Sequence, residues 1–252
     1  MRGFIKTYWK TLLFFVVVGL IGGYFIGLYA LESYPPQMQQ EMLAQGMSAG
    51  MLGLISALQS AGYGLVLGAA GIWLGRKVGL WKDQRHITKK PLLAALIISL
   101  IGGLALIFPD LLFFGKYEQA LLDMYAVKPT IPYLLATVTY GAVIEEIMLR
   151  LFMMSLVAFV LHLLFERKNK EVSTAVLVAA NVVSALLFAA GHLPVNEMMF
   201  GLTPMIVFRC FLLNGVFGLA FGWLYRRFGL RYAMIAHGGC HVVSKLIWIL
   251  FL

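Results

Sequence analysis

The sequence has few charged residues and no long hydrophilic stretch. Charged residues occupy only 12% of its 252 positions, about half the share found in soluble domains. Hydrophobic residues occupy 61%, and the mean hydropathy is +0.87. These values exclude an ordinary soluble protein. They predict an all-α, polytopic transmembrane helical bundle of about seven spans (six to eight), built as one membrane domain over residues 1–252.

Cysteine is also scarce. Cys210 and Cys240 are the only two, and both lie in apolar segments. Two such cysteines do not make a disulfide framework, so we expect small buried side chains.

Acidic residues are outnumbered by basic ones, 11 against 20, for a net charge of +9. Their distribution argues against nucleic acid as a partner. Fifteen of the 20 basic residues lie near the N-terminus and in the loops 76–90, 166–171 and 226–231, whereas the loops between these hold only Lys116 and Lys128. This is the positive-inside pattern. It predicts an integral membrane protein, in contact with the lipid bilayer, with the N-terminus cytoplasmic and the C-terminus outside. We expect the membrane to be that of a bacterial cell.

Seven apolar segments separate these loops. They cover 11–31, 46–75, 91–114, 132–165, 173–191, 204–225 and 230–252. The fourth would be about 51 Å long as one α-helix, against a hydrocarbon core of about 30 Å. We therefore expect it to break, tilt steeply or project from the membrane, and Gly141 is a candidate position for a break.

Glycines recur at four-residue spacing in several segments, for example Gly19, Gly23 and Gly27. Small residues at this spacing let helices approach closely. We expect them to pack helices together inside the bundle. The sequence leaves the oligomeric state open.

The most costly feature is a cluster of charges in the fourth segment, formed by Glu145, Glu146 and Arg150. Left unpaired at mid-bilayer, the three would cost roughly 8 kcal/mol together, so a functional site is expected. Glu146 and Arg150 share a helix face, four residues apart, and can form an ion pair. Glu145 then remains free for acid–base chemistry.

Three histidines are further candidates for this site. His192 ends the fifth segment, and His237 and His241 lie four residues apart in the last one. Helices of a bundle can bring such groups to one interior site. Imidazole and carboxylate are ligands of Zn²⁺, so Glu145, His192, His237 and His241 are candidate ligands for Zn²⁺ or another divalent metal ion. No organic cofactor is expected. Arg209 and Lys245 are expected to extend toward the lipid headgroups.

Three motifs resemble those of the CPBP (ABI) family of intramembrane proteases, which includes the type II CAAX prenyl endopeptidases and proteins of bacteriocin processing and self-immunity. They are Glu145-Glu146-x-x-x-Arg150, Phe188-x-x-x-His192 and His237-x-x-x-His241. The resemblance covers roughly 132–250, which we expect to be the catalytic core. The N-terminal spans, about 11–114, carry no comparable motif.

The resemblance implies a protease in which Glu145, assisted by His192, activates a water molecule. His237 and residue 241 would stabilise the oxyanion directly or through a metal ion, as in a metalloprotease, while Glu146 and Arg150 hold the geometry. The family usually has Asn or Asp where this chain has His241. An imidazole can donate a hydrogen bond as Asn does, and it adds a potential metal ligand.

The sequence thus predicts an intramembrane endopeptidase, CAAX-protease-like and dependent on glutamate or metal, that cleaves a membrane-associated or exported peptide or protein. Two alternatives remain. A proton or metal-ion transporter also uses buried Glu and His, although no inverted repeat is visible. A non-catalytic immunity or scaffold protein would keep the fold without the reaction. Distances along the helices favour a cavity between mid-bilayer and the outer face.

Overall fold

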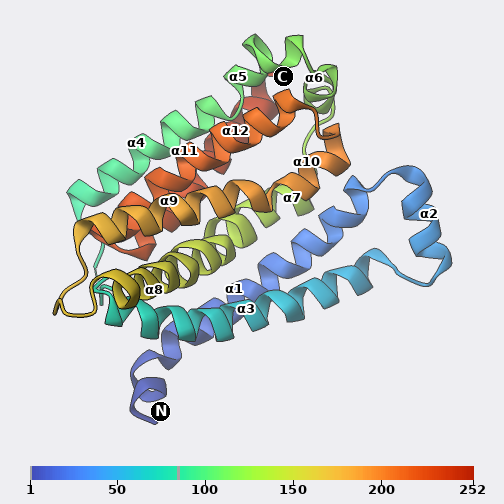
Figure 1. Cartoon of the computed structure of the whole chain (residues 1–252). Helices are drawn as coiled ribbons and strands as arrows, with labels where there is room; N and C mark the ends of the chain where they lie inside the picture. Colours follow the sequence, from blue (N-terminus) through green and yellow to red (C-terminus); the bar gives the residue numbers. More distant parts are fainter. Residues whose placement is uncertain (1, 84–85) are drawn as a thin grey trace.

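The computed structural model describes residues 2–83 and 86–252, and within these ranges the chain is helical with no β-strand. Seven helical segments among these residues are long and apolar enough to cross a membrane. They cover Gly3–Ser33, Ala49–Lys77, Lys89–Lys116, Ile131–Phe165, Thr174–Phe200, Pro204–Phe228 and Leu230–Phe251. The predicted all-α bundle of about seven spans is confirmed (Figure 1).

The long helices are joined by short helices, most of which lie at one end of the bundle (Figure 1). In chain order the elements are α1 (Arg2–Ser33), α2 (Pro36–Ala44), α3 (Ala49–Lys77), α4 (Lys89–Ala105), α5 (Phe108–Leu112), the 3₁₀ turn η1 (Phe114–Lys116), α6 (Gln119–Tyr125), α7 (Ile131–Ala136), η2 (Thr137–Glu145), η3 (Ile147–Met154), α8 (Ser155–Phe165), α9 (Thr174–Gly191), α10 (Leu193–Phe200), α11 (Pro204–Phe228) and α12 (Leu230–Phe251).

Hydroxyl side chains start several of these helices. The oxygens of Ser48, Thr130, Ser173 and Thr203 each accept a hydrogen bond from the backbone N–H three residues on, at the starts of α3, α7, α9 and α11. Such caps satisfy backbone donors that a helix leaves unpaired.

The glycine repeat of α1 packs that helix against α3. A Cβ at Gly19 would lie 2.6 Å from the carbonyl oxygen of Ser60, and one at Gly27 would lie 2.5 Å from that of Leu52. No side chain fits at such distances, so the backbones meet directly. The prediction that these glycines pack helices inside the bundle is confirmed.

The fourth span runs through the centre of the bundle as α7, η2, η3 and α8, and it packs against α1, α3, α9 and α12. The candidate break at Gly141 is wrong, because the helix continues through it. Instead, η2 and η3 are π-helical over Thr137–Met154, apart from Glu146 between them. A π-helix has wider turns and a shorter rise per residue, so a long segment fits a thinner layer, and π-helical turns are frequent at functional sites.

Glycines on the neighbouring helices make room for this wide helix. A Cβ at Gly22 of α1 would lie 2.7 Å from the backbone nitrogen of Tyr140, and one at Gly71 of α3 would lie 2.7 Å from the side chain of Leu151. The side chain of Ser184 in α9 donates a hydrogen bond to the carbonyl of Leu149 at 2.6 Å.

The two ends of the bundle differ. The loop between α8 and α9 lies at the left in Figure 1, with the start of α4, whereas α2, α6 and α10 lie at the right. The first end carries the basic loops of the sequence. The second carries the short connecting helices and the C-terminus.

Candidate active site

Glu146 and Arg150 form a buried ion pair in the central helix. Arg150 Nη1 lies 3.2 Å from Glu146 Oε1, and the two side chains are 1% and 0% exposed. His237 of α12 reaches the same carboxylate oxygen, with Nδ1 at 2.9 Å. The buried carboxylate of Glu146 is tolerated because Arg150 and His237 both pair with it. Glu146 is thereby engaged by two groups and does not face the cavity described below.

Aromatic rings enclose the guanidinium of Arg150. It lies 4.3 Å from the ring centre of Phe188 in α9 and 5.5 Å from that of Phe221 in α11. Both distances suit cation–π contacts. Gly218 makes space for it, since a Cβ there would lie 3.2 Å from Arg150 Nη2 and 3.0 Å from the Cβ of Ala185. The Phe of the second motif therefore supports the Arg of the first.

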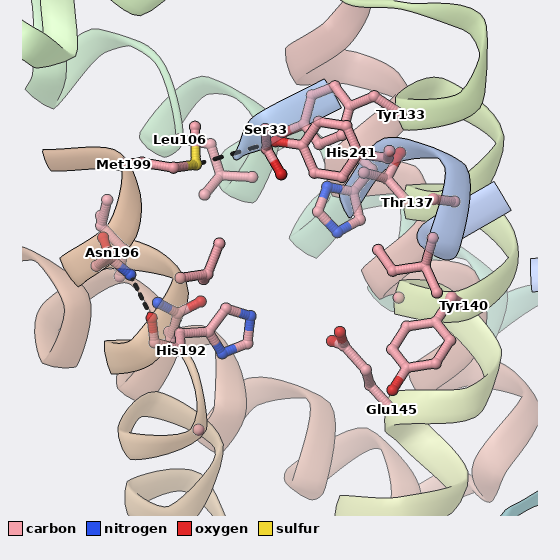
Figure 2. Close-up of a pocket in the computed structure, with 18 of the residues that line it drawn as sticks. Ser33, Leu106, Tyr133, Thr137, Tyr140, Glu145, His192, Asn196, Met199 and His241 are labelled. Atoms are coloured by element: carbon pink, nitrogen blue, oxygen red, sulfur yellow. Dashed lines mark hydrogen bonds between the residues drawn. The ribbon is translucent and has the colours of Figure 1, made fainter. Parts of the chain in front are cut away.

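Glu145 projects into a cavity of about 750 Å³, a volume typical of ligand sites. Its side chain is 21% exposed, and Oε2 lies 3.9 Å from His237 Nε2. Figure 2 shows the carboxylate of Glu145 beside Tyr140 on one wall, with His192 and Asn196 on the facing wall. The two adjacent glutamates thus occupy different environments, one sealed and one open.

His192 presents one ring nitrogen to this cavity. Its Nδ1 lies 2.8 Å from the carbonyl oxygen of Phe188. A carbonyl can only accept, so Nδ1 carries the hydrogen and Nε2 of the neutral ring keeps its lone pair. Asn196 donates a hydrogen bond to the carbonyl of His192 at 2.7 Å, and the ring packs edge-on against Phe188. The imidazole is therefore held in one orientation.

The imidazole ring of His237 is oriented in the same way. Its Nδ1–H donates to Glu146, which leaves Nε2 directed toward Glu145. Its ring stacks on Phe221, with ring centres 4.7 Å apart, and lies 5.0 Å from the ring of His241. His241 lines the main cavity with Glu145 and His192. A smaller adjoining cavity is lined by His192, His237 and His241 together. All six residues singled out from the sequence therefore lie in or against one site.

The histidines and Glu145 are of the types that bind metal ions, but among the described residues their side chains do not converge on one ion position. In the described part of the chain, no three His, Cys, Asp or Glu side chains are positioned to hold a metal ion. The chemistry still fits, because metal-binding histidines commonly donate one N–H to a carbonyl or carboxylate and ligate through the other nitrogen. His192 and His237 both have this form.

Two cationic side chains, Arg209 and Lys245, make contacts that the sequence did not indicate. Arg209 forms an ion pair inside the bundle. It donates from Nε and Nη2 to the two carboxylate oxygens of Asp110 in α5, at 2.5 and 2.6 Å. Asp110 is fully buried and also accepts from the hydroxyl of Tyr125. Lys245 also lines the cavity. The sequence indicated neither the ion pair of Arg209 nor the place of Lys245 in the cavity wall.

The cavity also takes part of its wall from outside the predicted core. Tyr29 and Ser33 of α1, and Leu106 after α4, line it with residues of the motifs. The hydroxyl of Tyr29 touches the sulfur of Met199 in α10 at 3.9 Å, so α1 and α10 meet across the cavity. The N-terminal spans therefore help to shape the site although they carry no motif.

A family model of known proteins matches the part of the chain that carries this site. Residues 127–243 match the family model described as type II CAAX prenyl endopeptidase Rce1-like. This part of the chain is an Rce1-like domain. The predicted resemblance to the CPBP family is thereby confirmed over these residues. The Rce1-like domain begins just before α7 and ends within α12, so it includes all six site residues. No curated protein and no solved structure matches the chain.

Proposed function

We propose that the chain is an intramembrane endopeptidase in which Glu145 activates a water molecule for attack on a peptide bond. One observation carries the proposal: of two adjacent carboxylates, Glu146 is sealed with Arg150 and His237, whereas Glu145 faces the cavity. The Rce1-like domain supports a CAAX-protease-like activity of this kind.

The first step is proton removal from water. A water between Glu145 and His192 would give one proton to the carboxylate of Glu145 and donate its other hydrogen to Nε2 of His192. That nitrogen is available as an acceptor because Nδ1–H is committed to Phe188. The oxygen would then attack the scissile carbonyl, as general-base catalysis requires.

The negative charge that develops on the carbonyl oxygen needs hydrogen-bond donors. His241 supplies one ring N–H, and His237 supplies another from Nε2 when its ring is protonated. Glu146 orients that ring by accepting from Nδ1, much as a carboxylate orients the histidine of a hydrolase triad. The proton held by Glu145 then passes to the leaving amine, which completes the hydrolysis.

The surrounding bundle suits a substrate that is anchored in or near the membrane. A polar cavity at membrane depth is allowed where protein lines it. This one is lined by the ends of α1, α9 and α12 at the end of the bundle away from the basic loops. With the N-terminus in the cytoplasm, the substrate would be a membrane-associated or exported peptide or protein that reaches the site from the outer side.

A metal-assisted form of the same reaction is the second candidate. It is favoured by the free Nε2 atoms of His192 and His237, whose Nδ1 atoms face a carbonyl and a carboxylate. Glu145, His192, His237 and His241 would hold the ion, which would supply Lewis-acid polarisation of the water or carbonyl. Chelation separates the two forms: activity of the purified protein survives exhaustive chelation in the glutamate-only form. In the metal-assisted form it is lost and returns with Zn²⁺.

The experiment that tests the proposed function is a comparison of membrane and secreted peptides between cells with the native chain and cells with Glu145→Ala. Peptides that end at a new terminus only in the native cells identify substrates. Identical peptide sets, with both proteins present at equal levels in the membrane, would contradict the proposal.

A further inference from the structure

Lys245 lies in the cavity wall, and the proposed mechanism gives it no role. Two aromatic rings hold its ammonium group: Nζ is 4.6 Å from the ring centre of Tyr133 and 5.6 Å from that of Trp248. Both rings line the same cavity. Cation–π contacts of this kind position a cation without neutralising it.

Lys245 also differs from the other cation of the cavity. Arg209 is neutralised by its two hydrogen bonds to Asp110. Among residues 2–83 and 86–252, by contrast, no carboxylate forms an ion pair with Lys245. A positioned cation without a counter-ion, at the wall of a cavity inside a membrane domain, is unfavourable unless an anion comes to it.

The position of Lys245 relates it to the reaction centre. His237, His241 and Lys245 follow one another at four-residue steps along α12, so they lie on one face of that helix. The eight residues from His237 to Lys245 correspond to a rise of about 12 Å. An extended peptide covers this distance in three to four residues at about 3.3 to 3.6 Å each. Glu145 lies beside His237 at one end of this row, and the cation lies at the other.

We propose that Lys245 binds a carboxylate of the substrate peptide, three to four residues from the scissile bond, and so selects substrates that carry one there. The carboxylate is either the C-terminus of the peptide or an acidic side chain. This inference rests on the proposed peptidase function, which supplies the scissile bond. Lys245 is a specificity residue, because it contacts the substrate but not the reacting atoms.

Binding measurements test this without cleavage. The full chain with Glu145→Gln is placed in lipid nanodiscs, and three fluorescent peptides of one apolar sequence are titrated. The first has a free C-terminal carboxylate. The second has a C-terminal amide, and the third has the amide together with one glutamate side chain. We expect at least one of the acidic peptides to bind about tenfold more tightly than the neutral amide, as a charge-assisted hydrogen bond allows.

Substitution of Lys245 assigns the effect. In Lys245→Met, which keeps the length of the side chain, the acidic and neutral peptides should bind within about twofold of each other, and in Lys245→Arg the preference should remain. Preference for the first or the third peptide distinguishes the C-terminus from an acidic side chain. Equal binding of all three peptides to the chain that retains Lys245 would overturn the inference, as would a preference that persists in Lys245→Met. Failure of the native protein to cleave any peptide would instead refute the proposed function, because the binding comparison uses the Glu145→Gln chain throughout.

Discussion

His237 connects the two adjacent glutamates: its Nδ1–H donates to Glu146 Oε1 at 2.9 Å, and its Nε2 lies 3.9 Å from Glu145 Oε2. The 3.9 Å separation is longer than a hydrogen bond. It leaves Nε2 directed at the region where a substrate carbonyl would meet the water. One imidazole thus links the buried ion pair to the open carboxylate.

The ion pair predicts the effect of removing its cation. Arg150→Ala leaves Glu146 buried with only His237 as a partner and empties the space between Phe188 and Phe221. We expect a loss of about 3 to 5 kcal/mol in the free energy of unfolding, together with loss of activity. Denaturant titration of the purified protein measures the first quantity.

The control for Arg150→Ala is the double variant Glu146→Gln with Arg150→Met. It removes both charges and keeps side-chain volume, so stability should largely return while activity does not. A double variant that is less stable than Arg150→Ala would show that the pairing does not account for the burial of these groups.

The packing of Arg150 predicts a contrast between two glycines of α11. In Gly218→Ala the new methyl group meets Ala185 and Arg150 Nη2, so we expect a destabilisation of about 1 to 3 kcal/mol and reduced activity. At Gly215 a Cβ would have no neighbouring atom within 4 Å. Gly215→Ala is therefore the matched control and should be neutral or slightly stabilising. Thermal unfolding of both variants checks this, and equal destabilisation would argue against the tight contact at Gly218.

Much of this architecture could be predicted from the sequence, because the signals are local. The spans follow from hydropathy, and the pairing of Glu146 with Arg150 follows from their four-residue spacing on one helix. The close approach of α1 and α3 follows from the glycine repeat. Each of these features depends on residues that are neighbours along one element.

The features that were missed depend on contacts between elements distant in the sequence. The π-helical turns of Thr137–Met154 depend on space at Gly22 and Gly71 in other helices. The partner of Arg209 is Asp110, 99 residues away. Both are isolated charges in apolar segments, and this complementarity was the signal that could have paired them. No comparable signal places Lys245 in the cavity, because its position depends on the rings of Tyr133 and Trp248.

The distribution of basic residues predicts which side of the membrane the cavity faces. Gln40 lies in α2, Gly191 lines the cavity, and Lys168 lies in the basic loop between α8 and α9. With the N-terminus in the cytoplasm, cysteines at Gln40 and Gly191 should react with an impermeant reagent added to intact cells. A cysteine at Lys168 should react only after permeabilisation.

The native cysteines should not interfere with this labelling, because Cys210 and Cys240 are both buried. Labelling of Gly191→Cys only from the cytoplasmic side, with Gln40→Cys still labelled from outside, would place the entrance of the cavity on the opposite side from that proposed. Labelling of Lys168→Cys in intact cells would reverse the whole topology.

The division of roles between Glu145 and Glu146 is tested most directly by the turnover of Glu145→Gln on a peptide that the native protein cleaves. The amide keeps the size of the side chain but cannot accept the proton of water, so we expect kcat to fall by about 10²- to 10⁴-fold. The unfolding temperature should stay close to that of the native protein, because Glu145 has no buried ion pair to lose. A Glu145→Gln protein that retains the native kcat would contradict the account.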